Sequence, residues 1–377
     1  MRCYDVNMRL FTAVVVAAFV ADCTPPAADE SPDPVPEAPQ PSSVVVLDDA
    51  RIGSNGDLDN FQVVRGDLDV GVARVASAML IVDLRTTCFP FEQWATEPPP
   101  AGENWPASCD AFDRNFHFLV DDPDDAAVDD AIVPVVPIEL VRAITPFGGP
   151  LHLEVDVTDV VNGLVGSDRG GLHRLSAHIT TYSDGDGIVS GSNGGWNVSA
   201  RLDLVPGTSA RNVVDVRPLF FGNLVTGSES TSHVVALEAG QFANLLVRTT
   251  GHGGPNSDAD CFGPAEEFCR RVHHVQVDDV VSLDLVPLRE DCAALCTLTT
   301  GTIPGGGTIP FCLENPTGSI DSVRASRANW CPGSVTPPFE IEVGGDRVGG
   351  DRVVSWGVSR IADGGSWLTS VTAFVVR

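Results

Sequence analysis

Hydrophobic and polar residues alternate one by one along several segments of this chain. The alternation is clear in 151–157, 198–204 and 339–343 and less regular in 371–376. A period of two is expected for β-strands that have one buried face and one face in water. Glycine (37 residues) and proline (28 residues) are frequent between these runs, where turns require them. The pattern therefore predicts an all-β fold built from short antiparallel strands.

The length of 377 residues is too great for one ordinary core and suits two domains. A convincing long helix is missing, and only 159–164 could form one or two helical turns. The strand pattern breaks near the middle of the chain, at 206–212. We therefore expect an N-terminal sandwich over 46–209 and a C-terminal sandwich over 210–377.

The first residues, 1–23, are typical of an export signal. The apolar run 10–20 is too short to span a bilayer and suits a signal-peptide core. It is followed by a bacterial lipobox-like sequence that ends at Cys23, although Asp22 stands where a small residue is usual. Residues 24–45, rich in Pro, Ala and Glu, predict a disordered tether. We expect an exported protein, either secreted or held at the cell surface or outer membrane as a lipoprotein anchored at Cys23.

The cysteines support export. Besides Cys3 and Cys23, the chain has eight: Cys88, Cys109, Cys261, Cys269, Cys292, Cys296, Cys312 and Cys331. An even set in an exported chain is typical of disulfides. No CxxC pair occurs and no cysteine pair precedes histidines at zinc spacing, so we expect neither a metal nor a cofactor. Acids outnumber bases 51 to 23, for a net charge of −28, which argues against nucleic acid as a partner.

Four sequence blocks carry a resemblance to a known family. They are CDAFDR at 109–114, ITPF and LEVDVTD within 144–159, AEEFC with a following histidine at 265–273, and SRANWCPG at 326–333. In the same order and with cysteines in register, they resemble blocks of the bacterial peptide-N-glycosidase F family. Members of that family are amidases that strip N-linked glycans from asparagine. The resemblance covers most of residues 75–377.

The resemblance implies two eight-stranded antiparallel jelly rolls in tandem, with the active site in a cleft between them. It also implies three disulfides: Cys88–Cys109, Cys261–Cys269 and Cys292–Cys331. Cys296 and Cys312 have no counterpart in the family, and we expect them to form a fourth bridge. The loop between Cys88 and Cys109 is longer than in the family and carries Trp94 and Trp105. We expect this loop to roof or reshape the cleft.

By the same resemblance, Asp113 matches the main catalytic aspartate and Glu267 the glutamate contributed by the second domain. The neighbouring Glu266 leaves this register ambiguous by one residue. Two carboxylates from different domains could share a water molecule, each shifting the pKa of the other. A structural alternative remains for both, as turn or surface acids.

The resemblance also implies a set of residues that bind the glycan. Arg114 and Arg327 match arginines at the sugar, and aromatic rings are expected to cover the apolar faces of pyranoses. The candidate rings are Trp94, Trp105, Tyr182, Phe268 and Trp330, of which we favour the last three. Arg327 and Trp330 could instead be structural and stack beside the Cys331 bridge. We expect a monomer that binds N-linked glycans or glycopeptides.

One departure from the family opens other functions. Thr180 stands where the family has a third acid, and Asp184 lies four residues too far along to replace it on a regular strand. A non-catalytic glycan-binding surface protein is therefore an alternative. A copper-dependent monooxygenase, which shares this fold, is a weaker one. His273 and His274 would point to opposite strand faces, and the second half of the chain has no methionine.

Overall fold

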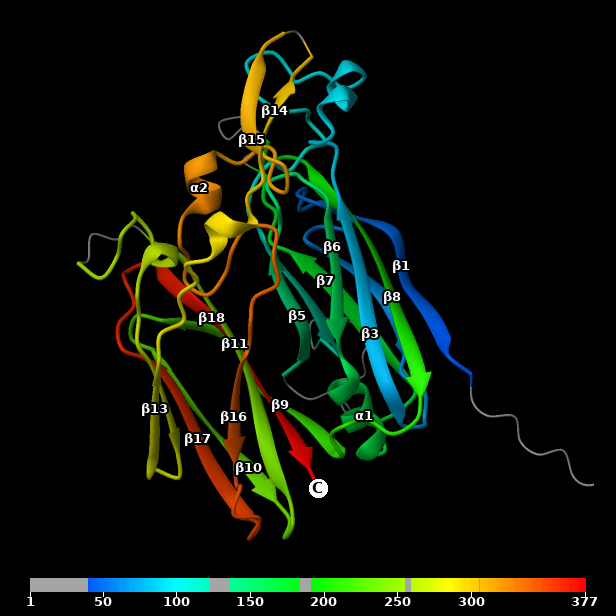
Figure 1. Cartoon of the computed structure of the whole chain (residues 1–377), viewed down its shortest axis with the longest axis vertical. Helices are drawn as coiled ribbons and strands as arrows, with labels where there is room; N and C mark the ends of the chain where they lie inside the picture. The colour runs from blue at the N-terminus through cyan, green and yellow to red at the C-terminus, as the bar shows by residue number, and fades with distance from the viewer. Residues whose placement is uncertain (1–39, 123–135, 184–190, 255–258, 305) are drawn as a thin grey trace, which may run out of the picture. The chain divides into compact units, whose positions relative to one another are not determined.

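Alternating burial along the strands builds two separate β-sandwiches (Figure 1). The computed structural model describes residues 40–122, 136–183, 191–254, 259–304 and 306–377. The N-terminal sandwich consists of β1 (Ser42–Gly53), β2 (Val63–Asp69), β3 (Val75–Arg85), β4 (Asn115–Val120), β5 (Ile138–Ile144), β6 (Leu151–Asp156), β7 (Leu172–Ile179) and β8 (Gly195–Pro206). In β8 every second residue from Trp196 to Leu204 is buried, as the alternation predicts.

The C-terminal sandwich repeats this design with one insertion. It consists of β9 (Val213–Val225), β10 (Ser230–Leu237), β11 (Phe242–Gly253), β12 (His273–Val277), β13 (Val281–Leu285), β16 (Phe339–Val343), β17 (Gly350–Val358) and β18 (Gly365–Val376). A separate two-stranded hairpin, β14 (Leu298–Thr302) and β15 (Thr308–Cys312), is inserted before β16.

Both sandwiches have the same strand order. The N-terminal sheets run β1-β8-β3-β6 and β2-β7-β4-β5. The C-terminal sheets run β9-β18-β11-β16 and β10-β17-β12-β13, which is the same order once the hairpin is left out. All the strand pairs are antiparallel. This pattern is the eight-stranded jelly roll, so the predicted all-β fold of two tandem jelly rolls is confirmed.

Helices are few in the described residues. The α-helices are α1 (Thr158–Gly166), which contains the predicted helical piece, and α2 (Ile320–Arg324). The short 3₁₀ segments are η1 (Phe91–Ala95), η2 (Glu266–Phe268) and η3 (Cys292–Leu295). None of the described helices is both long and apolar enough to cross a membrane.

The ends of the sandwiches lie close to the positions expected from the sequence. β1 begins at Ser42, four residues before the expected start at 46, so the last residues assigned to the tether are part of a strand. β8 ends at Pro206 and β9 begins at Val213, on either side of the expected boundary. The signal segment, Cys23 and the tether up to residue 39 lie outside the described residues.

The apolar core of the N-terminal sandwich extends onto one sheet of the C-terminal sandwich. It contains the inner residues of the N-terminal sandwich together with four residues from β9 and β18: Val213, Val216, Phe374 and Val376. Helix α1 contributes Val160, Val161 and Leu164 to the same core. Gly163 and Gly166 of α1 allow this approach, because an added Cβ would come within 2.8 Å and 2.6 Å of β9 atoms. A second core lies within the C-terminal sandwich, around Trp356 and Trp367.

A polar network joins the sandwiches where β5 meets β11 and β18. The buried Arg142 forms two hydrogen bonds to the Glu139 carboxylate, at 2.7 and 2.9 Å, and also binds Thr250 Oγ1 and the Leu368 carbonyl. Arg248 of β11 donates to the carbonyls of Glu139 and Leu140 at 3.0 and 2.9 Å. These bonds satisfy charges that burial would otherwise make costly.

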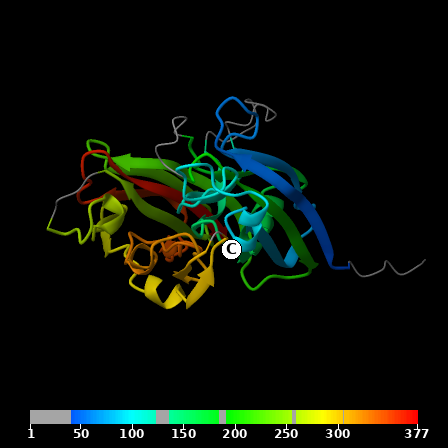
Figure 2. The same ribbon diagram turned by 90° about the horizontal axis from the view of Figure 1, so that it is seen from above.

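All four expected disulfides are confirmed. The structure has Cys88–Cys109, Cys261–Cys269, Cys292–Cys331 and Cys296–Cys312. The first closes the long loop that follows β3, and the last ties η3 to the end of β15. This loop and the β14–β15 hairpin pack against each other, and both views show them together at the domain boundary (Figures 1 and 2).

Candidate functional site

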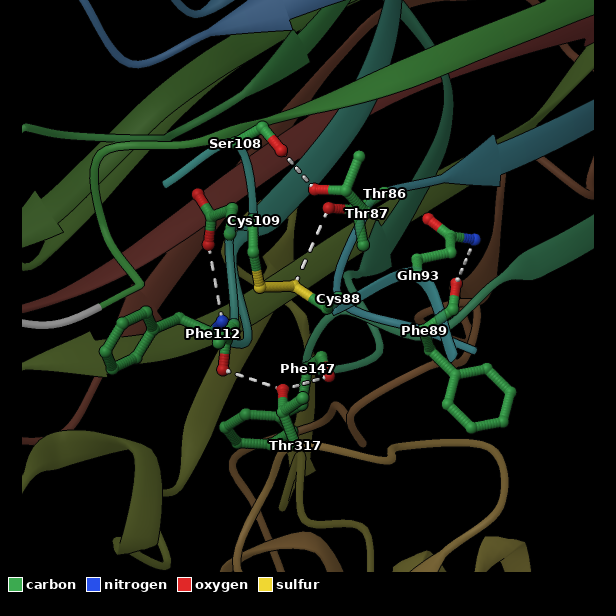
Figure 3. The surroundings of a disulfide bond; sticks show 12 residues. Thr86, Thr87, Cys88, Phe89, Gln93, Ser108, Cys109, Phe112, Phe147 and Thr317 are labelled. Atoms are coloured by element: carbon green, nitrogen blue, oxygen red, sulfur yellow. Dashed lines mark hydrogen bonds between the residues drawn. A yellow bond between two sulfur atoms is a disulfide. The ribbon is translucent and has the colours of Figure 1, made fainter. Parts of the chain in front are cut away.

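The loop before β4 presents Asp113 and Arg114. The Cys88–Cys109 disulfide holds its start (Figure 3). The hydroxyl of Thr145 holds its end, donating to the Phe112 carbonyl at 2.8 Å and accepting from the Arg114 amide at 2.8 Å. The backbone is therefore held in place on both sides of Asp113.

Arg114 is buried between a carboxylate and two rings. Its Nε lies 3.1 Å from Oδ1 of the buried Asp110, and its guanidinium lies 4.8 Å from the Phe112 ring and 4.2 Å from the Tyr182 ring. Burial raises the pKa of Asp110 to about 6, although Arg114 opposes this rise. The Nη2 of Arg114 is buried without a hydrogen-bond partner in the described part of the chain. Arg114 is thus held in place with one donor unused.

The structure resolves which of the two adjacent glutamates faces the site. The buried Glu266 carboxylate accepts from Arg271 at 2.7 and 2.9 Å and from the Trp367 indole at 2.9 Å. Burial alone would raise its pKa, but these hydrogen bonds hold it below the usual value. Glu267 remains partly accessible, and its Oε1 lies 3.7 Å from Nε of Arg327. Glu266 is therefore structural and Glu267 is the candidate.

Arg327 is the second buried guanidinium. It lies 4.2 Å from the Phe268 ring and 5.1 Å from the Trp330 ring. Its Nη2 donates to the Ser322 carbonyl and hydroxyl, at 2.8 and 3.0 Å. Burial lowers the pKa of Arg327, while Glu267 and then Asp113 raise it. Its Nη1 has no hydrogen-bond partner within the described residues.

The acids from the two sandwiches interact electrostatically. Burial, followed by the negative charge of Glu267, raises the pKa of Asp113 to about 7, while Arg327 and Arg114 oppose the rise. Burial also raises the pKa of Glu267, and Arg327 lowers it. The structure thus brings Asp113, Arg114, Glu267 and Arg327 into one electrostatic cluster. A carboxylate with a pKa near neutrality is suited to proton transfer.

The candidate rings differ in exposure. Tyr182 is 42% exposed and Phe268 is partly accessible, so both could contact a ligand beside the guanidinium that each one covers. Trp330 is 1% exposed, its indole donates to the Gly251 carbonyl at 3.0 Å, and His252 stacks on it at 5.6 Å. Trp330 has no open face for a sugar, and the structural alternative fits it better.

The long loop does not present Trp94 to solvent. Trp94 is 6% exposed and its indole donates to the Cys88 carbonyl at 3.0 Å, so it packs inside the loop instead of roofing a cleft. Trp105 is partly accessible and lies 6.3 Å from Phe112. Thr180 is exposed just after β7 and its amide donates to the Asn115 carbonyl at 3.1 Å, beside the Asp113 loop. Asp184 lies outside the described residues.

The histidine pair behaves as the alternation predicts. His273 is fully buried between Trp356 and Trp367, whereas His274 is on the opposite face and pairs with Asp284 at 2.6 Å. The two rings cannot hold one copper ion between them. Elsewhere in the described chain, Asp291, Cys292 and Cys331 lie close enough for a metal, but the two cysteines form a disulfide and offer no thiolate.

A cavity of about 520 Å³ lies elsewhere along the domain boundary. It is lined by residues of α1, β11 and β16, among them Asp159, Asn244, Arg248 and Glu340. Neither Asp113 nor Glu267 lines it. The acid cluster and this cavity are therefore separate features.

Sequence reasoning missed the residues that hold the site residues in place. Asp110 anchors Arg114 and Thr145 anchors the loop, although both stand in the blocks that carry the resemblance. The partner of Glu266, Arg271, is five residues further along the chain. In each case the signal was a polar residue beside a cysteine or within a mainly apolar segment.

Comparison with known proteins places this arrangement in a class. The arrangement is one of two tandem jelly rolls, each of which contributes an acid to the cluster. Residues 226–370 match the family model described as "Peptide-N-glycosidase F, C terminal". The search of curated proteins found no match to this chain. Residues 226–370 are thus similar in sequence to the C-terminal part of peptide-N-glycosidase F, a match that covers less than half of the chain.

Solved structures show the same fold at low identity. A recombinant peptide:N-glycanase F (PNGase F) matches with a TM-score of 0.62 and 16% identity, over 90% of this chain and 96% of that one. PNGase F of Flavobacterium meningosepticum, described as a glycosylasparaginase, matches with a TM-score of 0.62 and 15% identity over the same shares. PNGF-II matches with a TM-score of 0.60 and 17% identity, over 89% of this chain and 65% of that one.

The two adjacent glutamates can be separated by experiment. Glu266→Gln should destabilise the fold by roughly 3 kcal/mol, because it breaks a buried pair with Arg271. Glu267→Gln should destabilise the fold less, because Glu267 is partly exposed and its contact with Arg327 is longer, at 3.7 Å. Thermal unfolding of both variants checks this. A stable Glu266→Gln beside an unstable Glu267→Gln would reverse the assignment.

Proposed function

We propose that the protein is an amidase that hydrolyses the bond between an N-linked glycan and asparagine in glycoproteins or glycopeptides. The observation that carries the proposal is the electrostatic interaction between Asp113 and Glu267, one from each sandwich, together with two buried guanidiniums that interact with Asp113. The peptide-N-glycosidase F-like fold supports it, since a matched structure is described as a peptide-N(4)-(N-acetyl-β-D-glucosaminyl)asparagine amidase.

In the proposed reaction, water adds to the side-chain carbonyl carbon of the glycosylated asparagine. Asp113 accepts a proton from that water, which its pKa of about 7 allows near neutral pH. The carbon–nitrogen bond to the glycan then breaks, and the nitrogen leaves with the glycan after receiving a proton from Asp113. Aspartate remains in the peptide. The charge of Glu267 makes Asp113 a stronger base, and the guanidiniums offset the negative charge that develops.

Arg114 and Arg327 are the proposed cations of the glycan site, and they act mainly through their charge, because Arg114 is 7% and Arg327 1% exposed. Asp110 holds Arg114 in place, and Ser322 holds Arg327. Tyr182 and Phe268 cover these guanidiniums and would pack on sugar rings. Trp330 supports Arg327 from within the fold.

A second candidate function is glycan binding without hydrolysis. The observation that favours it is Thr180, which stands beside the Asp113 loop without a carboxylate. The guanidiniums and the rings would serve a lectin as well as an enzyme. The two candidates differ only in whether the amide bond is cut.

Incubation with a glycopeptide followed by mass spectrometry separates the two functions. We expect release of the glycan and a peptide that carries aspartate in place of the glycosylated asparagine. Binding without this conversion would support the lectin and contradict the amidase. The four disulfides fit an oxidising environment, and we propose that the protein acts after export.

A further inference from the structure

Phe311 of the β14–β15 hairpin packs against rings of the long loop after β3. Its ring centre lies 5.2 Å from Phe91 and 6.0 Å from Phe89, and Phe91 lies 5.3 Å from Trp94. Phe91, Trp94 and Phe311 are each at most 6% exposed. We call these four residues, Phe89, Phe91, Trp94 and Phe311, the aromatic clamp. It joins a loop of the N-terminal sandwich to a hairpin of the C-terminal sandwich.

The packing in the clamp is tight enough to restrict its neighbours. A Cβ added to Gly301 of β14 would come within 2.9 Å of the Phe311 ring and 3.4 Å of the Phe91 ring. Only a glycine fits there without displacing a ring. The two strands of the hairpin pair from Leu298↔Cys312 to Thr302↔Thr308. The backbone of Phe311 is therefore fixed by this strand pairing, and its ring by the neighbouring rings.

Each side of the clamp is linked covalently to one half of the acid cluster. On the N-terminal side, Cys88 adjoins Phe89 and is bridged to Cys109, four residues before Asp113 (Figure 3). On the C-terminal side, Cys312 adjoins Phe311 and is bridged to Cys296. The nearby Cys292 is in turn bridged to Cys331, which follows Arg327 by four residues.

A second contact runs parallel to the clamp. Thr317, five residues after β15, donates to the Ala111 carbonyl at 3.4 Å and also bonds the Phe147 carbonyl. Ala111 is two residues before Asp113. The segment that carries the hairpin therefore touches the Asp113 loop directly.

We propose that the aromatic clamp is a positioning element that sets the separation between the Asp113 loop of one sandwich and the Arg327 and Glu267 loops of the other. Phe311 is its central residue. It contacts no reacting group and acts through the two disulfide-linked loops. The expected effect on kcat rests on the proposed amidase function. The expected effect on the separation of the loops and on the pKa of Asp113 does not.

The acid cluster should respond sharply to such a change. The groups that face Asp113 are Glu267, Arg327 and Arg114, and their interaction with it varies steeply with distance in a buried site. A misplacement of about 1 Å can cost roughly 100-fold in rate. Loss of the clamp should separate the acids and admit water, so the pKa of Asp113 should fall towards its ordinary value.

The test compares three single variants with the wild type. Phe311→Ala removes the central ring, and Phe311→Leu keeps most of its volume. Phe220→Ala is the matched control, because it removes a half-buried ring that lies 5.8 Å from His233 within one sandwich. Two readouts are measured: kcat and KM on one glycopeptide, and the Asp113 pKa by carboxyl-carbon NMR titration.

For Phe311→Ala we expect kcat to fall roughly 10- to 100-fold with KM nearly unchanged. The Asp113 titration and the acidic limb of the rate profile should both move to lower pH. Phe311→Leu should recover most of both, and Phe220→Ala should change neither. A Phe311→Ala protein with the wild-type kcat and the wild-type titration would overturn the proposal.

The outcomes separate this inference from the proposed function. If the wild type releases no glycan, the amidase proposal fails, and the Asp113 titration alone decides the role of the clamp. If Phe311→Ala does not fold, Phe89→Ala decides, because it removes a partly buried ring that lies 6.0 Å from Phe311. A downward shift of the Asp113 pKa in Phe89→Ala supports the clamp, and an unshifted value contradicts it.

Discussion

Asp113→Asn is expected to reduce glycan release by at least roughly 1,000-fold while the fold is retained. Asparagine has nearly the same shape as aspartate but cannot accept the proton of the attacking water at neutral pH. The loop should keep its conformation, because Thr145 and the Cys88–Cys109 bridge hold it through the backbone. Release is measured by mass spectrometry on a glycopeptide. Undiminished release would remove Asp113 from the mechanism.

The same variant should become more stable at neutral and higher pH. The pKa of Asp113 is raised to about 7 in the folded protein from an ordinary value of 3.8. Between these values the folded state holds a proton that the unfolded state has lost, so wild-type stability falls as pH rises through this window. Asp113→Asn removes this loss. Because the side chain keeps some contact with water, we expect a gain of about 2 kcal/mol above pH 7 and little gain near pH 4.

Thermal unfolding at the two pH values checks this second result. A stabilised but inactive Asp113→Asn would show that the charge of Asp113 is costly to the fold and is kept for function. A variant that is destabilised at both pH values would indicate instead that the carboxylate is an ordinary structural partner.

The second large effect concerns the boundary between the sandwiches. Arg142→Ala should lower the free energy of unfolding by about 3–5 kcal/mol, because it leaves the buried Glu139 carboxylate without its cation. Urea unfolding measures this loss. The matched control is Arg85→Ala, whose partner Asp49 and whose own side chain are largely exposed, and which should cost less than about 1 kcal/mol. Equal effects in the two variants would contradict the assignment of Arg142 as an interface residue.

Local patterns were sufficient to predict the strands, because burial on one face imposes a period of two. β8 and β16 follow this rule directly. The strand order could not be read in this way, since it depends on pairings between distant segments such as β1 with β8. The jelly-roll order and three of the disulfides were predicted from the family resemblance.

The candidate site was predictable in its residue types but not in its contacts. Glu266 and Glu267 are adjacent in a short 3₁₀ turn, where no alternation tells which side chain points inward. Only the positions of Arg271 and Trp367 show that Glu266 is the one used by the fold. The sequence predicts that Trp330 contacts a sugar. In the structure its indole instead donates to the Gly251 carbonyl and its ring stacks on His252.

The buried ion pair between Glu139 and Arg142 could not be predicted from the sequence, for a different reason. All seven residues of β5 are buried, including Glu139 and Arg142. The sequence of β5 is apolar except for Glu139 and Arg142. Such a sequence is consistent with an edge strand whose charged side chains face water, or with a buried ion pair. The partners that distinguish these cases, Thr250 and Leu368, lie more than one hundred residues away in the chain.

Because the N-terminal core extends onto β9 and β18, we expect neither sandwich to be stable and soluble on its own. Val213, Val216, Phe374 and Val376 would be uncovered if the chain were divided between β8 and β9. A fragment that began at β9 would expose this strip to water and tend to associate through it. Residues 226–370 therefore depend on the N-terminal sandwich to cover this apolar strip.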